Sequence, residues 1–162
     1  MNLITNRTPR DVERWRELRD KGWDDMSAIE RQEWLGEIET TPSATRGMYT
    51  HNDLNRVEKA VESISERLLV LGYISSPLVV KTDWTYKDNV WREDMTRYIG
   101  NISLLRSIGI VFPTTPEAPS IKNKMNYSVA NDIEQILTDI DILVTKLTSS
   151  QMYVGELISG EV

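Results

Sequence analysis

Four residues between positions 84 and 91 combine aromatic rings with a carboxylate: Trp84, Tyr86, Asp88 and Trp91. Aromatic rings present a large apolar face with a polar edge, and a carboxylate beside them accepts hydrogen bonds from hydroxyl groups. Many proteins bind sugar rings with this combination. We therefore treat these four side chains as the candidate binding residues, in a predicted surface patch at the entrance of a helix.

The other tryptophans of the chain have a simpler interpretation. Trp15, Trp23 and Trp34 all lie in the first 40 residues, a segment that otherwise contains little apolar area. A small helical unit of this size needs large side chains to form a core. We expect these three rings to form that core.

Two pairs of acidic residues raise the question of glycoside hydrolysis, which needs a general acid and a second carboxylate. The pairs are Asp83 with Asp88, and Asp139 with Asp141. Residues two apart on a helix point about 200° from each other, so Asp139 and Asp141 do not face a common substrate. Asp83 and Asp88 fit turn and capping roles. We predict no catalytic residues and a protein that is not an enzyme.

Metal ligation receives no support from the pattern. Oxygen ligands gather at Asp83, Asp88, Asn89 and Asp94, but their spacing does not match the 12-residue calcium loop. His51 is the single histidine and there are no cysteines, so a zinc site of ordinary composition is excluded. We expect neither a metal nor a cofactor.

The charge balance argues against nucleic acid as a partner. The chain has 162 residues and a net charge of −6, whereas phosphate binding needs clustered cations. Arginines do gather near the N-terminus, but acidic residues interleave with them, which predicts a solvated helix face with ion pairs one turn apart. The arginines are Arg7, Arg10, Arg14, Arg16 and Arg19.

The sequence also contains no pattern typical of a secreted or membrane protein. The N-terminus lacks the apolar stretch of a signal peptide, and no stretch approaches the roughly 20 apolar residues of a membrane span. We expect synthesis and folding in the bacterial cytoplasm and no association with a membrane.

Two long segments carry apolar residues three or four positions apart, the spacing of helices that pack in a bundle. The first set is Leu54, Val57, Val61, Ile64, Leu68 and Leu71, and the second is Val129, Ile133, Ile136, Ile140, Leu143 and Leu147. A further helix is predicted from about Trp91 to Ser107. These segments predict an all-α fold with a three-helix bundle over residues 49–150.

The remaining segments complete the predicted organisation. Helix-capping signals predict a helical hairpin in residues 1–40, and the run TTPSATRG predicts a linker over 41–48. Pro77 and the β-branched residues after it favour an extended segment that crosses the bundle. In the tail, residues 151–162, weak alternation is compatible with a short strand.

Several longer sequence segments resemble modules of tail-associated structural proteins from phages and prophages of Gram-positive gut bacteria. The strongest similarity lies in NDLNRV at 52–57, KTDW at 81–84 and NYSVANDIE at 126–134, and it extends over most of the chain. The resemblance implies a non-enzymatic component of a tail, baseplate or fibre, which becomes part of the virion and contacts other tail proteins. It carries no catalytic residues over to this sequence.

Three functions therefore remain open at this stage. The leading one is a structural and interaction module of a phage tail, with Trp84, Tyr86 and Trp91 as anchors. The alternative is a carbohydrate-binding module for host cell-wall glycans. It predicts exposed, coplanar rings near Trp84, whereas the tail module predicts rings buried against the bundle or against another chain. A small hydrolase such as a muramidase is the third. The apolar faces of the two long helices are compatible with packing inside one chain or between the chains of a homo-oligomer.

Overall fold

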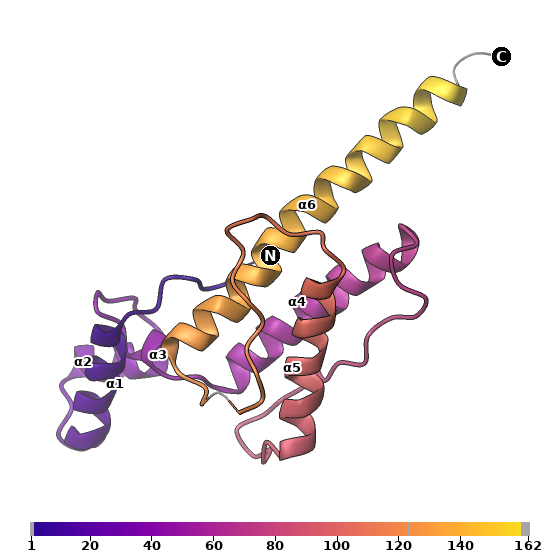
Figure 1. The fold of residues 1–162 in the computed structure, drawn as a ribbon. Coiled ribbons are helices and arrows are strands. Elements are labelled where there is room, and N and C mark those ends of the chain that lie inside the picture. The colour runs from indigo at the N-terminus through magenta and orange to yellow at the C-terminus, as the bar shows by residue number, and fades with distance from the viewer. Residues whose placement is uncertain (1, 123, 160–162) are drawn as a thin grey trace.

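The computed structural model describes residues 2–122 and 124–159, the last nine of these as backbone only. This part of the chain contains helices and no strands, which confirms the predicted all-α class (Figure 1). The helices are α1 (Pro9–Lys21), α2 (Ala28–Leu35), α3 (Ala44–Gly47), α4 (His51–Val70), α5 (Arg92–Ser107) and α6 (Tyr127–Ser159).

Local capping signals set the start of three helices. Thr8, Ser27 and Thr50 each accept a hydrogen bond from a backbone N–H in the first turn of the helix that follows. In each case a carboxylate three residues further on bonds back to the cap, which completes a capping box. These starts follow from the local sequence, because every donor and acceptor involved lies within one turn.

The first three helices form a small unit, which we call the N-terminal lobe. Leu18, Met26 and Ala44 are its buried core, with Trp15 and Trp34 packed against them. Trp23 is about half exposed, at 47%, so the expectation that all three tryptophans form this core is wrong for Trp23. The predicted linker at 41–48 is not an unstructured connection between two units, because its second half folds into α3 and packs on α1.

Helices α4, α5 and α6 pack against one another as the predicted three-helix bundle. Its core contains the buried residues of the two predicted apolar sets, on α4 and α6, together with Tyr98, Ile99, Ile102 and Leu105 from α5. The extended segment between α4 and α5 crosses this bundle, and Ile74, Leu78, Val80 and Trp84 pack against the core. The prediction of a crossing segment is thus confirmed.

Helix α6 is longer than the sequence pattern predicts. It has 33 residues, or about 50 Å at 1.5 Å per residue, and its C-terminal part extends beyond the bundle (Figure 1). Residues 151–159 are helical, so the short strand considered for the tail is wrong there, and 160–162 lie outside the described residues. Gly155 lowers helix propensity but does not end the helix.

Candidate functional site

Trp84, the central residue of the predicted aromatic patch, is buried, with only 4% of its surface exposed. Its backbone N–H donates to Asn55 Oδ1 at 2.7 Å, and its carbonyl accepts from Asn55 Nδ2 at 2.8 Å. Its indole N–H donates to Glu58 Oε1 at 3.4 Å. The prediction that Trp84 lies on the surface is wrong, because α4 provides partners for both its backbone and its ring.

Glu58 is the anchor of the crossing segment. Its buried carboxylate accepts hydrogen bonds from both terminal nitrogens of Arg97 on α5, at 2.6 and 2.7 Å. It also accepts from the backbone N–H of Lys81 at 3.1 Å. These bonds raise the pKa of Arg97 and fix three parts of the bundle relative to one another.

Tyr86 and Trp91 do lie on the surface, with 79% and 65% of their areas exposed. Asp88, between them, closes the turn that precedes α5, because its Oδ2 accepts from the backbone N–H of Thr85 at 2.6 Å and from the Thr85 hydroxyl at 2.9 Å. These bonds keep the pKa of Asp88 below its usual value. The candidate set is thus divided: Trp84 and Asp88 are structural, and two rings remain available for contact.

A buried ion network joins the start of the chain to the bundle, and no local sequence pattern predicts it. Arg7 Nη2 contacts Asp53 Oδ1 at 2.9 Å and Glu134 Oε1 at 2.6 Å. Arg56 Nη2 contacts the same two oxygens, at 2.5 and 2.7 Å. Arg7 was expected on a solvated helix face, but only 4% of it is exposed. That expectation is wrong because Arg7 precedes α1 and meets carboxylates from α4 and α6.

Asn131 fixes the same segment through its backbone. Its side-chain amide donates to the carbonyl of Arg7 at 2.9 Å and accepts from the N–H of Arg7 at 3.0 Å. Both bonds hold the backbone of the segment that precedes α1 against α6. Residues 2–7, which we call the N-terminal arm, therefore lie against α6 before the chain reaches α1 (Figure 1).

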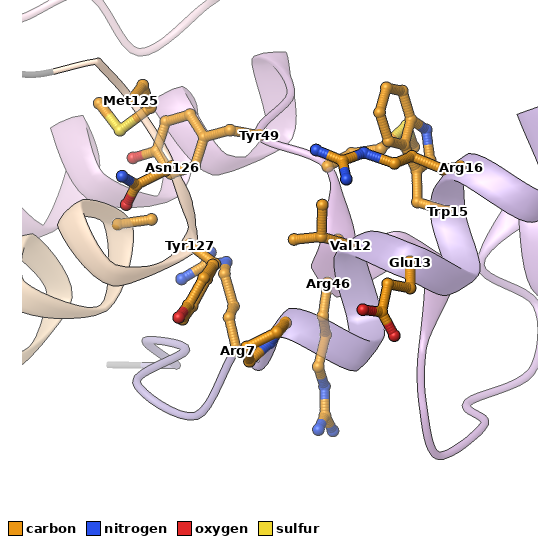
Figure 2. Close-up of a pocket in the computed structure, with 14 residues that line it drawn as sticks. Arg7, Val12, Glu13, Trp15, Arg16, Arg46, Tyr49, Met125, Asn126 and Tyr127 are labelled. Atoms are coloured by element: carbon orange, nitrogen blue, oxygen red, sulfur yellow. The ribbon is translucent and has the colours of Figure 1, made fainter.

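A cavity of about 410 Å³ lies between the N-terminal lobe and the start of α6. Its lining includes Trp15 and Arg16 from α1, Tyr49 from the segment before α4, and Tyr127 from α6. In Figure 2 the side chain of Arg16 extends from α1 into the space between Trp15 and Tyr49, and that of Arg46 points away. None of these residues was predicted as a site. The interleaved charges of α1 made Arg16 resemble an ordinary surface residue.

Two carboxylates hold the lobe side of this cavity in place. Glu33, buried on α2, accepts from Arg14 Nη2 at 2.8 Å and from the backbone N–H of Ala44 at 3.1 Å. Asp11 accepts from the N–H of Ser43 at 2.7 Å. Burial raises the pKa of both carboxylates, but these hydrogen bonds outweigh it and leave each pKa below its ordinary value.

The second acidic pair considered for catalysis, Asp139 and Asp141, has other partners. Asp139 accepts from the Thr115 hydroxyl at 2.6 Å and from Gln135 at 2.7 Å, and Asp141 pairs with Arg67. Within the described residues, no group of three or more histidine, cysteine or acidic side chains is placed to hold a metal ion. No helix in that same part of the chain is long and apolar enough to cross a bilayer.

These features define an all-α protein with a helical lobe fixed to a three-helix bundle. When the chain was compared with protein-family models, with curated proteins and with solved structures, no significant match was found in any of the three comparisons.

Proposed function

We propose that the protein is a non-enzymatic structural and interaction module of a phage or prophage tail, in a baseplate or a fibre. The observation that carries the proposal is the presentation of Tyr86 and Trp91 on a turn fixed to the bundle on both sides. Before the turn, Trp84 is held by Asn55, and after it the N–H of Trp91 donates to Asp94 at 3.0 Å. Exposed aromatic rings on a rigid support are typical anchors of protein interfaces.

The buried ion pairs support a scaffold role in a second way. The arm, the crossing segment and all three long helices are joined by charge-assisted hydrogen bonds around Glu134 and Glu58. Such contacts favour one arrangement of the helices over others of similar compactness, although they add little net stability. A subunit that must keep its shape between neighbouring proteins benefits from this rigidity.

The experiment that tests this proposal compares the mass in solution of the wild-type chain with that of the double variant Tyr86→Ser/Trp91→Ser. We expect the wild type to form a discrete trimer or hexamer, the symmetry of tail parts, and the double variant to dissociate. Trp23→Ser is the matched control, because Trp23 is an exposed ring on the N-terminal lobe. An oligomer that survives in the double variant would contradict the role assigned to the turn.

The glycan-binding alternative retains one specific observation in its favour, namely the two exposed rings. Trp84, however, is buried in the core of the bundle and cannot contact a glycan. Both carboxylate oxygens of Asp88 are already bound, one by Thr85 and the other by Lys81. A glycan array with the Tyr86→Ser/Trp91→Ser variant as control tests it. Binding to a cell-wall glycan that the variant loses would favour this alternative.

A further inference from the structure

The last turns of helix α6 stand clear of the bundle. α4 ends at Val70, and a shallow pocket at this end of the bundle is lined by Val70 and Leu71 from α4 and by Thr148 from α6. Figure 1 shows α6 continuing past this point, in yellow, away from the other described segments. We call residues 149–159 the C-terminal extension. Its backbone is helical up to Ser159.

The apolar pattern of α6 does not end where the bundle ends. Two rows of residues recur at strict seven-residue intervals, a repeat that is typical of helices in coiled coils. In heptad notation the d positions are Ile133, Ile140, Leu147 and Val154, and the a positions are Leu137, Val144, Gln151 and Ile158. We call these eight positions the seam. Its first half is completely buried in the bundle, at Ile133, Leu137, Ile140 and Val144.

The distribution of charge suits association with identical helices. Identical chains bring identical charges together, so a coiled coil of one chain with itself is favoured when the e and g positions beside the seam carry none. Residues 145–159 contain two charged side chains, Lys146 and Glu156, and both occupy outer positions, c and f. The e and g positions hold Thr148, Ser150, Gly155 and Leu157.

Helix propensity and seam composition indicate the number of partners. Residues 145–159 include two threonines, three serines, Val154 and Gly155, which are poor helix formers, so a helix here depends on packing for its stability. β-Branched residues occupy three of the four d positions, which disfavours two strands and favours three or four. Inside the bundle the same helix packs against two others, α4 and α5. A three-helix arrangement therefore continues the geometry of the bundle.

We propose that three copies of this chain associate through a parallel coiled coil formed by the second half of the seam, from Leu147 to Ile158. Past the end of α4, the α6 helices of two further copies take the places that α4 and α5 hold in the bundle. The inference rests on the proposed function, because it names the partner in the assembly as the chain itself. A coiled coil this short is marginal alone, so it acts together with the turn of Tyr86 and Trp91.

Single cysteines test the arrangement in the full chain, which has none of its own. Equivalent d positions of parallel helices come together, so Val154→Cys should give disulfide-linked dimers under mild oxidation, read on a non-reducing gel. At most about two thirds of the chains should be linked, because a trimer leaves one cysteine in three without a partner. Glu156→Cys is the matched control, since it lies at an outer position of the same helix and should stay unlinked.

A second pair of variants measures association without a covalent bond. Val154→Asp brings three like charges together in the seam, so the molar mass from light scattering should fall about threefold, from trimer to monomer. Tyr153→Asp adds the same charge at an outer c position and should leave the trimer intact. Both positions lie past the end of α4, so neither substitution should change the unfolding of the bundle in urea.

The outcomes separate this inference from the proposed function. A wild-type trimer overturns the coiled coil alone if Val154→Cys is linked no more than Glu156→Cys and Val154→Asp keeps its mass. Linked Val154→Cys chains support the coiled coil, and if the trimer then survives Tyr86→Ser/Trp91→Ser, the role of the turn is contradicted instead. A wild-type monomer without cross-linking of Val154→Cys overturns both.

Discussion

The guanidinium group of Arg7 and the carboxylate of Glu134 are joined at 2.6 Å, although 127 positions separate them in the chain. Both side chains are almost completely buried, at 2% and 0% exposure. The contact fixes the N-terminal arm to α6, and Asp53 and Arg56 of α4 complete the network. The N-terminal lobe follows the arm directly, so this network also sets the position of the lobe.

Replacing Glu134 by Gln should destabilise the protein strongly. The substitution leaves Arg7 and Arg56 near each other with Asp53 as their one remaining shared carboxylate, and breaking a buried ion pair from one side costs about 3–5 kcal/mol. The measurement is the free energy of unfolding in urea. Glu62→Gln is the control, because Glu62 is exposed on α4, and it should change stability by less than about 0.5 kcal/mol. Equal effects of the two substitutions would refute the role of the network.

Replacement by Ala should lower the stability of the protein strongly at Trp84 and very little at Trp91. Trp84 is packed in the bundle core, so its removal should cost about 3–5 kcal/mol of stability. Trp91 is mostly exposed, so its removal should leave stability within about 0.5 kcal/mol of the wild type. Thermal or urea unfolding of the two variants measures the difference. A stable Trp84→Ala variant would mean that the ring lies on the surface after all.

Gly47 permits the close approach of α3 to α1. A Cβ atom at this position would lie 2.1 Å from the carbonyl oxygen of Asp11, which is backbone and has little freedom to move. We expect Gly47→Ala to destabilise the lobe by at least about 1–3 kcal/mol. Gly100→Ala is the matched control, since a Cβ there meets open space on α5 and should stabilise by about 0.5–1 kcal/mol. Unchanged stability of Gly47→Ala in urea unfolding would disagree with this packing.

The N-terminal lobe should lose stability in acid. The pKa values of Asp11 and Glu33 in the folded protein lie below their ordinary values of 3.8 and 4.5. The unfolded chain therefore binds more protons as the pH falls, and the stabilisation that is complete above the ordinary pKa values is lost below them, between about pH 5 and pH 2. Unfolding in urea at a series of pH values measures this loss.

Glu33→Gln provides the comparison for the acid titration. This variant should be less stable at neutral pH, because Arg14 loses its buried partner, and its stability should depend less on pH between about pH 5 and pH 2. The indole signals of Trp15 and Trp34 report on the lobe itself. A wild-type lobe as stable at the acid end of this range as at neutral pH would contradict the assignment.

Features that depend on neighbours in sequence could be predicted, and features that depend on distant residues could not. Thr50 and Asp53 are three residues apart, which is the spacing of a capping box, and they cap α4. The second role of Asp53, as a partner of Arg7 and Arg56, depends on the tertiary arrangement. No local pattern indicates which of several interleaved arginines turns inward, so Arg7 was assigned to the solvent.

The candidate site shows the same limit. The extended segment that crosses the bundle and the start of α5 near Trp91 were correctly predicted, but burial of Trp84 depends on Asn55 and Glu58, almost 30 positions earlier. The cavity could not be predicted at all, since its walls come from three separate segments. In the tail, the weak alternation after residue 150 indicated a strand, whereas α6 continues its helix to Ser159.

The measurement that tests the proposed function most directly is the molar mass of the wild-type chain by light scattering coupled to size-exclusion chromatography, over a wide range of concentrations. An assembly module of a phage tail predicts a single species of trimeric or hexameric mass, given 18.7 kDa for one chain. A monomer that persists at every concentration would contradict the assembly role and leave glycan binding as the function to test.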